Sequence, residues 1–238
     1  MLIASLIKSL FIVMKNVIVL TGAGISAESG ISTFRDAGGL WEGHNVMEVA
    51  SPEGWKKNPA LVLDFYNKRR AQLLQVNPNA AHSALEDLEK KYEVQIITQN
   101  IDDLHERAGS SNVLHLHGEL FKVRSTLDEN LILDWKTDLV LGDFCKHNKQ
   151  LRPHIVWFGE EVPNLDYAIE ITKNADIFII IGTSLQVYPA ASLLHFTKPE
   201  IPIYYIDPEP VLLKHLPNPL EIINTSATNG MTILLKKI

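Results

Sequence analysis

The chain has 238 residues, which corresponds to one or two domains, and its 46% of hydrophobic residues exclude an intrinsically disordered protein. Its net charge of −6 argues against a protein that holds nucleic acid by bulk electrostatics, because such proteins usually present a basic face. The single cysteine, Cys145, excludes an internal disulfide framework, and no apolar run reaches the about 18 residues that span a membrane, so we expect a cytoplasmic protein.

The N-terminal segment of residues 1–13, MLIASLIKSLFIV, is apolar. It lacks the basic start and the small-residue cleavage site of a signal peptide. Met14 directly precedes the first predicted strand, and we favour it as the natural start. The sequence therefore predicts that residues 1–13 are a dispensable extension and that the domain spans residues 14–238.

Strand signals in this chain are continuous apolar runs, which are typical of parallel strands covered on both faces. They occur at residues 17–20, 94–97, 113–116, 155–158, 177–181 and 201–206. Helix-like stretches lie between them, at residues 60–74, 80–92, 165–174 and 190–197. This alternation predicts an α/β fold with a doubly wound, Rossmann-like parallel sheet. Residues 122–150 break the alternation, and we interpret them as a small inserted module.

A glycine-rich turn follows the first predicted strand, where residues 22–27 (GAGISA) fit the pattern G-x-G-x-x-G/A. Such a turn directs backbone N–H groups toward an anion at a helix N-terminus, so it predicts a nucleotide site. The alternative interpretation is a tight turn that glycine permits and that binds no ligand.

The residues after the turn argue against a dehydrogenase. A conventional dinucleotide fold has a second strand that ends in Asp or Glu about 20 residues later. Residues 30–41 instead contain glycines together with Phe34, Arg35 and Trp41, and the next strand begins only near residue 94. A long loop that carries an arginine over a phosphate site favours chemistry on the nucleotide over hydride transfer.

Polar side chains follow several of the predicted strands, and ligands of open α/β sheets bind beyond the carboxyl ends of the strands. The candidates are Gln99, Asn100, Asp102, Gly182, Thr183, Ser184 and Asp207. For the segment around Asp102, a turn with helix capping by Asp102 or Asp103 is an equally good interpretation.

Two histidines, His115 and His117, follow the strand predicted at residues 113–116. Strand alternation places them on opposite sides, so we expect one of them to face the crevice. A histidine titrates near neutral pH and can act as a general base. The alternatives are a structural histidine and a metal ligand, but no carboxylate or thiol stands at ligand spacing.

The combination of these motifs resembles the sirtuin family of NAD-dependent protein deacylases over residues 14–238. The matching segments are GAGISAESGISTFRDAGGLW (22–41), TQNIDDLHERAG (98–109), HLHGEL (115–120), VWFGE (156–160), IGTSLQVYPAA (181–191) and IDPEP (206–210). The resemblance implies a Rossmann-like NAD-binding domain with a small module inserted at about residues 120–155. Acyl-lysine would enter the cleft between the two parts.

The resemblance also implies roles for individual residues, with His117 as the general base. His117 would take a proton from a ribose hydroxyl after the acyl oxygen has displaced nicotinamide, and the products would be free lysine, nicotinamide and O-acyl-ADP-ribose. Val156, Phe158 and Gly159 would pair with the substrate backbone as an added strand. The implied NAD-binding residues are Gly22, Ala23, Gly24, Ile25, Ser26, Thr33, Phe34, Arg35, Trp41, Gln99, Asn100, Ile101, Asp102, Gly182, Thr183, Ser184, Asp207, Glu209 and Ala227.

Tyr66 and Arg69 bear on which acyl group is removed. They are three residues apart on a predicted helix and share a face, and arginine with a phenol can bind a carboxylate. The spacing looks like the Tyr-x-x-Arg signature of the sirtuin class that removes succinyl and malonyl groups, whose bacterial members also remove acetyl groups. The alternative is a surface arginine beside a half-buried tyrosine.

The small module departs from the family, most members of which bind a structural zinc there through four cysteines. Here Ser125 stands at the first expected cysteine, and only Cys145 remains, with His147 nearby. One thiolate and one histidine do not complete a tetrahedral site, so we expect no metal. Packing of Leu131, Leu133, Trp135, Leu139 and Leu141 is predicted to replace it.

Further departures are mild: Asp207 stands where the family usually has asparagine, and Ser32-Thr33 where many members have Pro-Asp.

Alternative functions are mono-ADP-ribosyl transfer from the same NAD pocket and a non-catalytic regulator that binds NAD or acyl-lysine. The expected partners are proteins with acylated lysines, with neither nucleic acid nor membrane, and the oligomeric state is left open.

Overall fold

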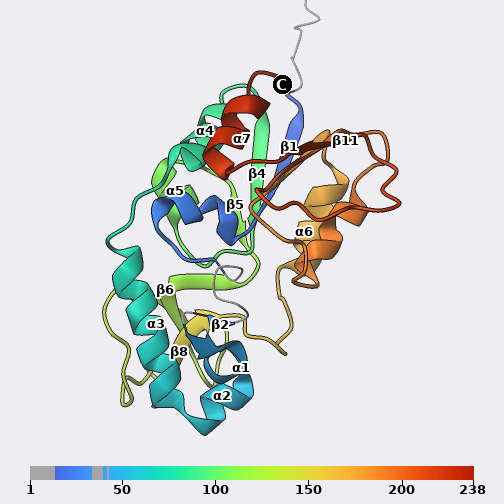
Figure 1. Cartoon of the computed structure of the whole chain (residues 1–238). Coiled ribbons are helices and arrows are strands. Elements are labelled where there is room, and N and C mark those ends of the chain that lie inside the picture. Colours follow the sequence, from blue (N-terminus) through green and yellow to red (C-terminus); the bar gives the residue numbers. More distant parts are fainter. Residues whose placement is uncertain (1–13, 34–39, 42) are drawn as a thin grey trace, which may run out of the picture.

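The computed structural model describes residues 14–33, 40–41 and 43–238, so the predicted extension and the loop residues Phe34 and Arg35 lie outside the described residues. The central element is a six-stranded parallel sheet with the strand order β11-β10-β9-β1-β4-β5 (Figure 1). Its strands are β1 (Asn16–Thr21), β4 (Glu93–Thr98), β5 (Val113–His115), β9 (Ile177–Ile181), β10 (Ile203–Ile206) and β11 (Leu220–Ile223). This sheet confirms the predicted α/β, Rossmann-like fold class.

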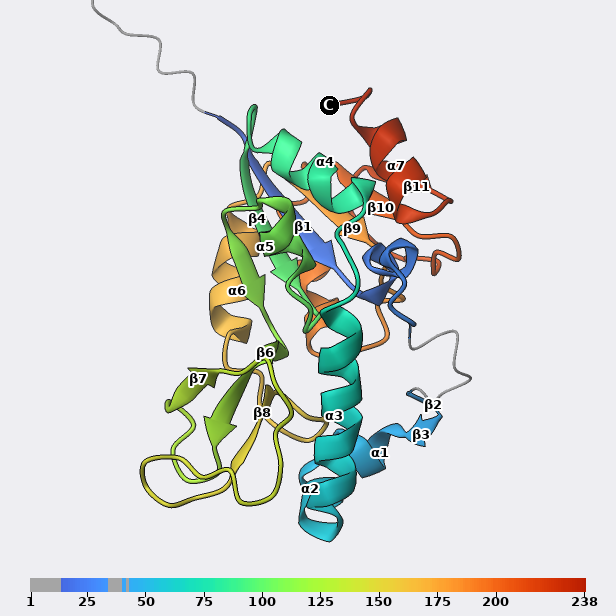
Figure 2. The same ribbon diagram turned by 90° about the vertical axis from the view of Figure 1, so that its left-hand side faces the viewer.

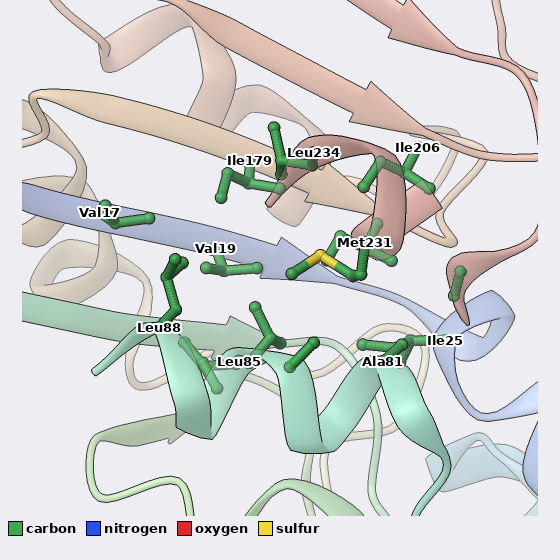
Figure 3. Close-up of a cluster of buried hydrophobic side chains, with 14 of the residues drawn as sticks. Val17, Val19, Ile25, Ala81, Leu85, Leu88, Ile179, Ile206, Met231 and Leu234 are labelled. Atoms are coloured by element: carbon green, nitrogen blue, oxygen red, sulfur yellow. The ribbon is translucent and has the colours of Figure 1, made fainter. Parts of the chain in front are cut away.

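Helices cover both faces of the sheet. Helices α4 (Ala80–Leu88) and α7 (Ala227–Leu234) pack on one face, where Val17 and Val19 of β1 meet Leu85 and Met231 (Figure 3). The other face, which Ile18 of β1 reaches, is covered by α6 (Leu165–Lys173) and the 3₁₀ helix η3 (Ala190–Phe196). Burial on both faces is the physical reason why these strands are continuous apolar runs.

A second, antiparallel sheet lies at the other end of the molecule from α4 and α7 (Figure 2). It has the order β7-β6-β8 and consists of β6 (Gly118–Ser125), β7 (Ile132–Asp134) and β8 (Leu151–Ile155). We call residues 118–155 the small module. Helices α1 (Val46–Val49), α2 (Pro52–Lys57) and α3 (Pro59–Leu73) pack beside it, and a cluster of apolar side chains joins α3 to β6 and β8. The remaining elements are α5 (Leu104–Ala108), the 3₁₀ helices η1 (Ala23–Ile25) and η2 (Ala27–Ser29), and the short strands β2 (Leu40–Trp41) and β3 (His44–Asn45).

One of the elements predicted from the sequence is wrong. The strand predicted at residues 155–158 ends at Ile155, because the next amides bond elsewhere: Val156 N donates to the carbonyl of His117 and Phe158 N to that of Ala50. The helix predicted at residues 190–197 exists as a 3₁₀ helix, Ala190–Phe196. The strand predicted at residues 177–181 has the bounds of β9, and the other predicted strands and helices exist with shifted ends. In the described part of the chain, no helix is both long enough and apolar enough to cross a membrane.

Candidate active site

A cavity of about 450 Å³ lies where the carboxyl ends of the parallel strands face the small module and α3. It brings together most of the residues that the sequence singled out. Those on its wall are Gly22, Ala23, Gly24, Thr33, Trp41, Tyr66, Arg69, Gln99, Asn100, Ile101, Asp102, His117, Val156, Phe158, Gly159, Gly182, Thr183, Ser184, Asp207 and Glu209. Ile25, Ser26 and Ala227 are buried behind the wall, Ile25 and Ala227 in the apolar cluster between the sheet and α7.

The glycine turn packs closely against the turn that follows β9. Gly24 N donates to the carbonyl of Gly182 at 2.8 Å, and a Cβ on Gly24 would lie 2.6 Å from the Gly182 Cα. A Cβ on Gly22 would likewise lie 2.7 Å from the Thr183 Cβ. The glycines are therefore needed for the contact between two strand-end turns. Two short 3₁₀ helices follow, at Ala23–Ile25 and Ala27–Ser29, where the motif predicted the N-terminus of a helix.

A buried hydrogen-bond network fixes the turn after β4. Ser26 Oγ donates to Asp102 Oδ2 at 3.0 Å and accepts a hydrogen bond from Asn100 Nδ2 at 3.2 Å. Asp102 also accepts from the backbone N–H of Leu104, yet burial raises the pKa of this carboxyl to about 6. Ser26 thus links the two polar residues that line this part of the cavity, although it does not line the cavity itself.

The hydroxyl groups and carboxylates at the other strand ends lie further along the cavity wall. Gln99 Nε2 donates to Thr183 Oγ1 at 3.1 Å, which ties the end of β4 to the end of β9. Asp207 follows β10, and its carboxylate accepts a hydrogen bond from Glu209 N at 2.8 Å. Glu28 bonds to Ser226 and Thr228 at the start of α7; burial opposes ionisation, but these hydrogen bonds lower the pKa of Glu28.

The two histidines of the HLHG segment have different surroundings. His117 lines the cavity, and its Nδ1 lies 3.0 Å from the carbonyl oxygen of Gln99. Burial lowers the pKa of His117, and the bond to Gln99 offsets only part of that effect. His115 lies between the carbonyl of Asn100, 2.9 Å from Nδ1, and the carboxylate of Glu106, 2.8 Å from Nε2. Burial opposes the charged form, but Glu106 raises the pKa of His115 above its ordinary value.

The end of the cavity next to α3 is mostly apolar. Tyr66 is fully buried, and its hydroxyl oxygen lies 3.0 Å from the indole nitrogen of Trp157. Burial raises the pKa of Tyr66 well above its ordinary value, so the phenol is neutral. Arg69, one turn further along α3, lies over the ring of Phe65, and burial lowers the pKa of its guanidinium.

Several residues of the cavity wall were not assigned from the sequence. Trp157 and Glu160 belong to the VWFGE segment, in which Val156, Phe158 and Gly159 were the assigned residues. Glu28 carried no signal, since its partners on α7 lie about 200 positions away in the chain. The N–H groups of Val156 and Phe158 donate within the chain, so they are not available to an added substrate strand.

The small module does not offer a zinc site. Ser125 Oγ lies 3.3 Å from Cys145 Sγ, and no group of three or more His, Cys, Asp and Glu residues suited to a metal exists among the described residues. A structural zinc needs four ligands, so the residues present do not fit it. Leu139 is buried beside Cys145, whereas Leu133 and Leu141, which were predicted to pack inside, are 39% and 55% exposed; that part of the prediction is wrong.

Comparison with known proteins gives one consistent family. Residues 22–189 match the sequence model of the Sir2 family. A Helicobacter pylori protein named NAD-dependent protein deacylase is 63% identical over 225 residues, which cover 94% of this chain and 98% of the relative. A protein of the same name from Bacteroides thetaiotaomicron is 53% identical over 224 residues, which cover 92% and 95%.

The solved structures agree with the sequence matches. A crystal structure described as a Sir2 homologue in complex with NAD superposes on this chain with a TM-score of 0.80 at 38% identity. The superposition covers 94% of this chain and 89% of the other.

Proposed function

This chain belongs to the Sir2 family, and we propose that it is an NAD-dependent protein deacylase that removes succinyl, malonyl and acetyl groups from lysine. The general activity, NAD-dependent protein deacylation, is the named activity of relatives that match more than nine-tenths of this chain. The choice of acyl group is a finer inference, and it rests on the part of the cavity next to α3.

The strand-end part of the cavity fits NAD as the second substrate. The glycine turn brings backbone groups to the wall, and the hydroxyl groups of Thr183 and Ser184 beside it suit phosphate or ribose oxygens. Asp207, further along, can accept hydrogen bonds from ribose hydroxyl groups. Bound NAD supplies a ribose carbon that the acyl oxygen attacks as nicotinamide leaves. Asn100 and Asp102 then lie where the nicotinamide ring would be held.

We infer that His117 acts as the general base. The Gln99 carbonyl can only accept a hydrogen bond, so Nδ1 of the neutral ring carries the hydrogen and Nε2 keeps its lone pair. Because burial lowers the pKa of His117, the ring is neutral at pH 7. Nε2 can then take the proton of a ribose hydroxyl group, which allows that oxygen to attack the activated acyl carbon.

The observation that carries the acyl preference is the position of Tyr66 and Arg69 on the wall of the cavity that also holds His117. The apolar wall residues Ala50, Leu73, Leu120, Ile155 and Trp157 pack in one cluster with Tyr66. The carboxylate of Glu160, which also lies on this wall, is paired with Arg152 and Arg124. A terminal carboxylate bound here would receive hydrogen bonds from a phenol and a guanidinium in apolar surroundings, where such bonds are strong. An acetyl group would fit the same space without using them.

A comparison of matched peptides tests the proposal. Arg69→Met should lower kcat/KM for a succinyl-lysine peptide by about 10- to 100-fold, because a hydrogen bond to a charged group contributes about 1.5–3 kcal/mol. The acetyl-lysine peptide should be affected less than about threefold. His117→Ala should abolish turnover of both peptides, followed as nicotinamide release and loss of acyl mass.

Lys68→Met is the matched control. Lys68 is next to Arg69 on α3, but its side chain is 64% exposed and lies outside the cavity wall. If the wild-type protein removes the acetyl group but not the succinyl group, it is a deacylase in which Tyr66 and Arg69 do not bind a carboxylate. ADP-ribose attached to a protein, with no loss of acyl mass from either peptide, would indicate the transferase alternative. Binding of NAD without any turnover would indicate the regulator.

A further inference from the structure

The hydroxyl group of Tyr66 has a fixed hydrogen-bond donor next to it. Trp157 Nε1 lies 3.0 Å from the Tyr66 oxygen, although 91 positions separate the two residues in the chain. An indole N–H can only donate, so the phenol oxygen is the acceptor in this bond. The hydroxyl hydrogen of Tyr66 must therefore point away from Trp157.

The ring of Tyr66 cannot easily turn away from this arrangement. It is fully buried and makes edge contacts with Phe65, at 5.1 Å between ring centroids, and with Trp41, at 6.1 Å. The ring position is therefore set by packing, and the freedom that remains is rotation of the O–H bond. The hydrogen bond from Trp157 restricts that rotation.

Trp157 is itself held in place by a charged group above its ring and by its backbone. The guanidinium carbon of Arg152 lies 3.3 Å from the ring centroid, and Arg152 donates to both oxygens of Glu160, at 2.6 and 3.1 Å. Glu160 also accepts from Trp157 N at 2.9 Å and from Arg124 at 3.1 Å. Since Arg124 lies on β6 and Arg152 on β8, this network ties Trp157 to two of the three strands of the small module.

We propose that Trp157 is a positioning residue for acyl specificity, which directs the hydroxyl hydrogen of Tyr66 toward the terminal carboxylate of the acyl group. This inference rests on the proposed function, in which Tyr66 and Arg69 bind that carboxylate. A donor that already points at its acceptor loses less freedom on binding, so the bond contributes more to affinity. An acetyl group has no carboxylate, so its removal does not depend on the direction of this hydrogen.

Trp157→Phe keeps an aromatic ring but removes the indole N–H. We expect KM for a succinyl-lysine peptide to rise about 5- to 15-fold, which is the effect of one neutral hydrogen bond, with kcat changed less than twofold. Both constants for the matched acetyl-lysine peptide should change less than twofold. Trp55→Phe is the control, because Trp55 packs against Trp157 at 5.8 Å and also loses an indole.

A double-mutant cycle separates positioning from general damage to the fold. In a Tyr66→Phe background the hydroxyl is gone, so adding Trp157→Phe should change the succinyl KM by less than about 1.5-fold. An equal effect of Trp157→Phe on both peptides, or an undiminished effect in the Tyr66→Phe background, overturns the inference. If the wild-type protein does not remove succinyl groups, both the proposed acyl preference and this inference are wrong. If Trp157→Phe keeps the wild-type preference for the succinyl-lysine peptide, only this inference is wrong.

A measurement on the wild-type protein covers the case in which Trp157→Phe does not fold. The indole N–H resonance of Trp157 is identified as the one that shifts in Tyr66→Phe. We expect it to shift on addition of the succinyl-lysine peptide without NAD and to stay in place with the acetyl-lysine peptide. The same response to both peptides contradicts the inference.

Discussion

In the six-stranded sheet every residue of β9 is buried, whereas in the small module every residue of β7 is exposed. The sheet is covered by aliphatic side chains on both faces, and its strands are bonded to one another along their length. The module has a much smaller interior, in which Val123, Leu139, Cys145 and Leu151 pack against Leu63 of α3. The sheet is therefore stabilised mainly by apolar burial, and the module needs other contacts.

Side-chain amides supply many of these contacts. Gln150 Nε2 donates to the carbonyls of Val140 and Leu151, and its Oε1 accepts from Gly142 N. Asn67 of α3 bonds to both the N–H and the carbonyl of Leu139, as a neighbouring strand would do. Irregular loops, which elsewhere in the family are joined by a metal, are held here by amide groups that satisfy their backbone.

The largest expected effect is a loss of stability of the sheet domain at acid pH. His82 of α4 is fully buried, its ring lies 4.9 Å from that of His105, and burial lowers its pKa to about 4. The unfolded chain binds this proton near pH 6.5, so the contribution to stability is complete above pH 6.5 and is lost as the pH falls toward 4. The loss amounts to about 3 kcal/mol at about 1.4 kcal/mol per pKa unit.

His82→Gln tests this assignment, because glutamine can still accept the hydrogen bond from Asn79 N that His82 Nδ1 accepts. Urea unfolding at several pH values should show a flatter loss of stability between pH 6.5 and 4 in the variant. His147→Gln, an exposed position in the small module, should leave the slope unchanged. A slope that is the same in all three proteins contradicts the role of His82.

An intermediate effect is expected from Asn67→Ala, which removes both bonds to Leu139. The backbone groups of Leu139 lose their partners, and the free energy of unfolding should fall by about 1–2 kcal/mol. Asn67→Asp keeps the acceptor and loses the donor, so it should lie between Asn67→Ala and the wild-type protein. Equal stability of Asn67→Ala and wild type in urea would show that the module does not depend on this contact.

The smallest expected effect is that of metal removal. Since Ser125 and Cys145 bond to each other and no zinc ligand set exists in the described part of the chain, EDTA should shift the Tm by less than about 1 °C. Metal analysis of the purified protein should give much less than one zinc per chain. A clear fall in Tm with EDTA, restored by zinc, would show that a metal and not the amide contacts stabilises the module.

The sheet and the strand-end side of the site were predictable, because local sequence encodes them. Apolar runs mark strands covered on both faces, and a parallel sheet brings the residues after each strand to one edge, as with Asn100 and Thr183. β11 was not predicted, since its strand, LEII, has only one fully buried residue. The bond between Trp157 and Tyr66 depends on packing between segments far apart in the chain, which periodicity does not report.

His115 and His117, two positions apart, lie in settings that favour different protonation states. Both nitrogens of His115 face oxygens that accept hydrogen bonds, a carbonyl and a carboxylate, so both bonds require an imidazolium. His117 has one such neighbour and a pKa shifted in the other direction. At pH values between the two pKa values the segment carries a cation, His115, that supports the Asn100 turn and, beside it, the uncharged ring of His117, which can accept a proton. Over this pH range the two histidines therefore keep separate roles, His115 as a structural cation and His117 as the proton acceptor.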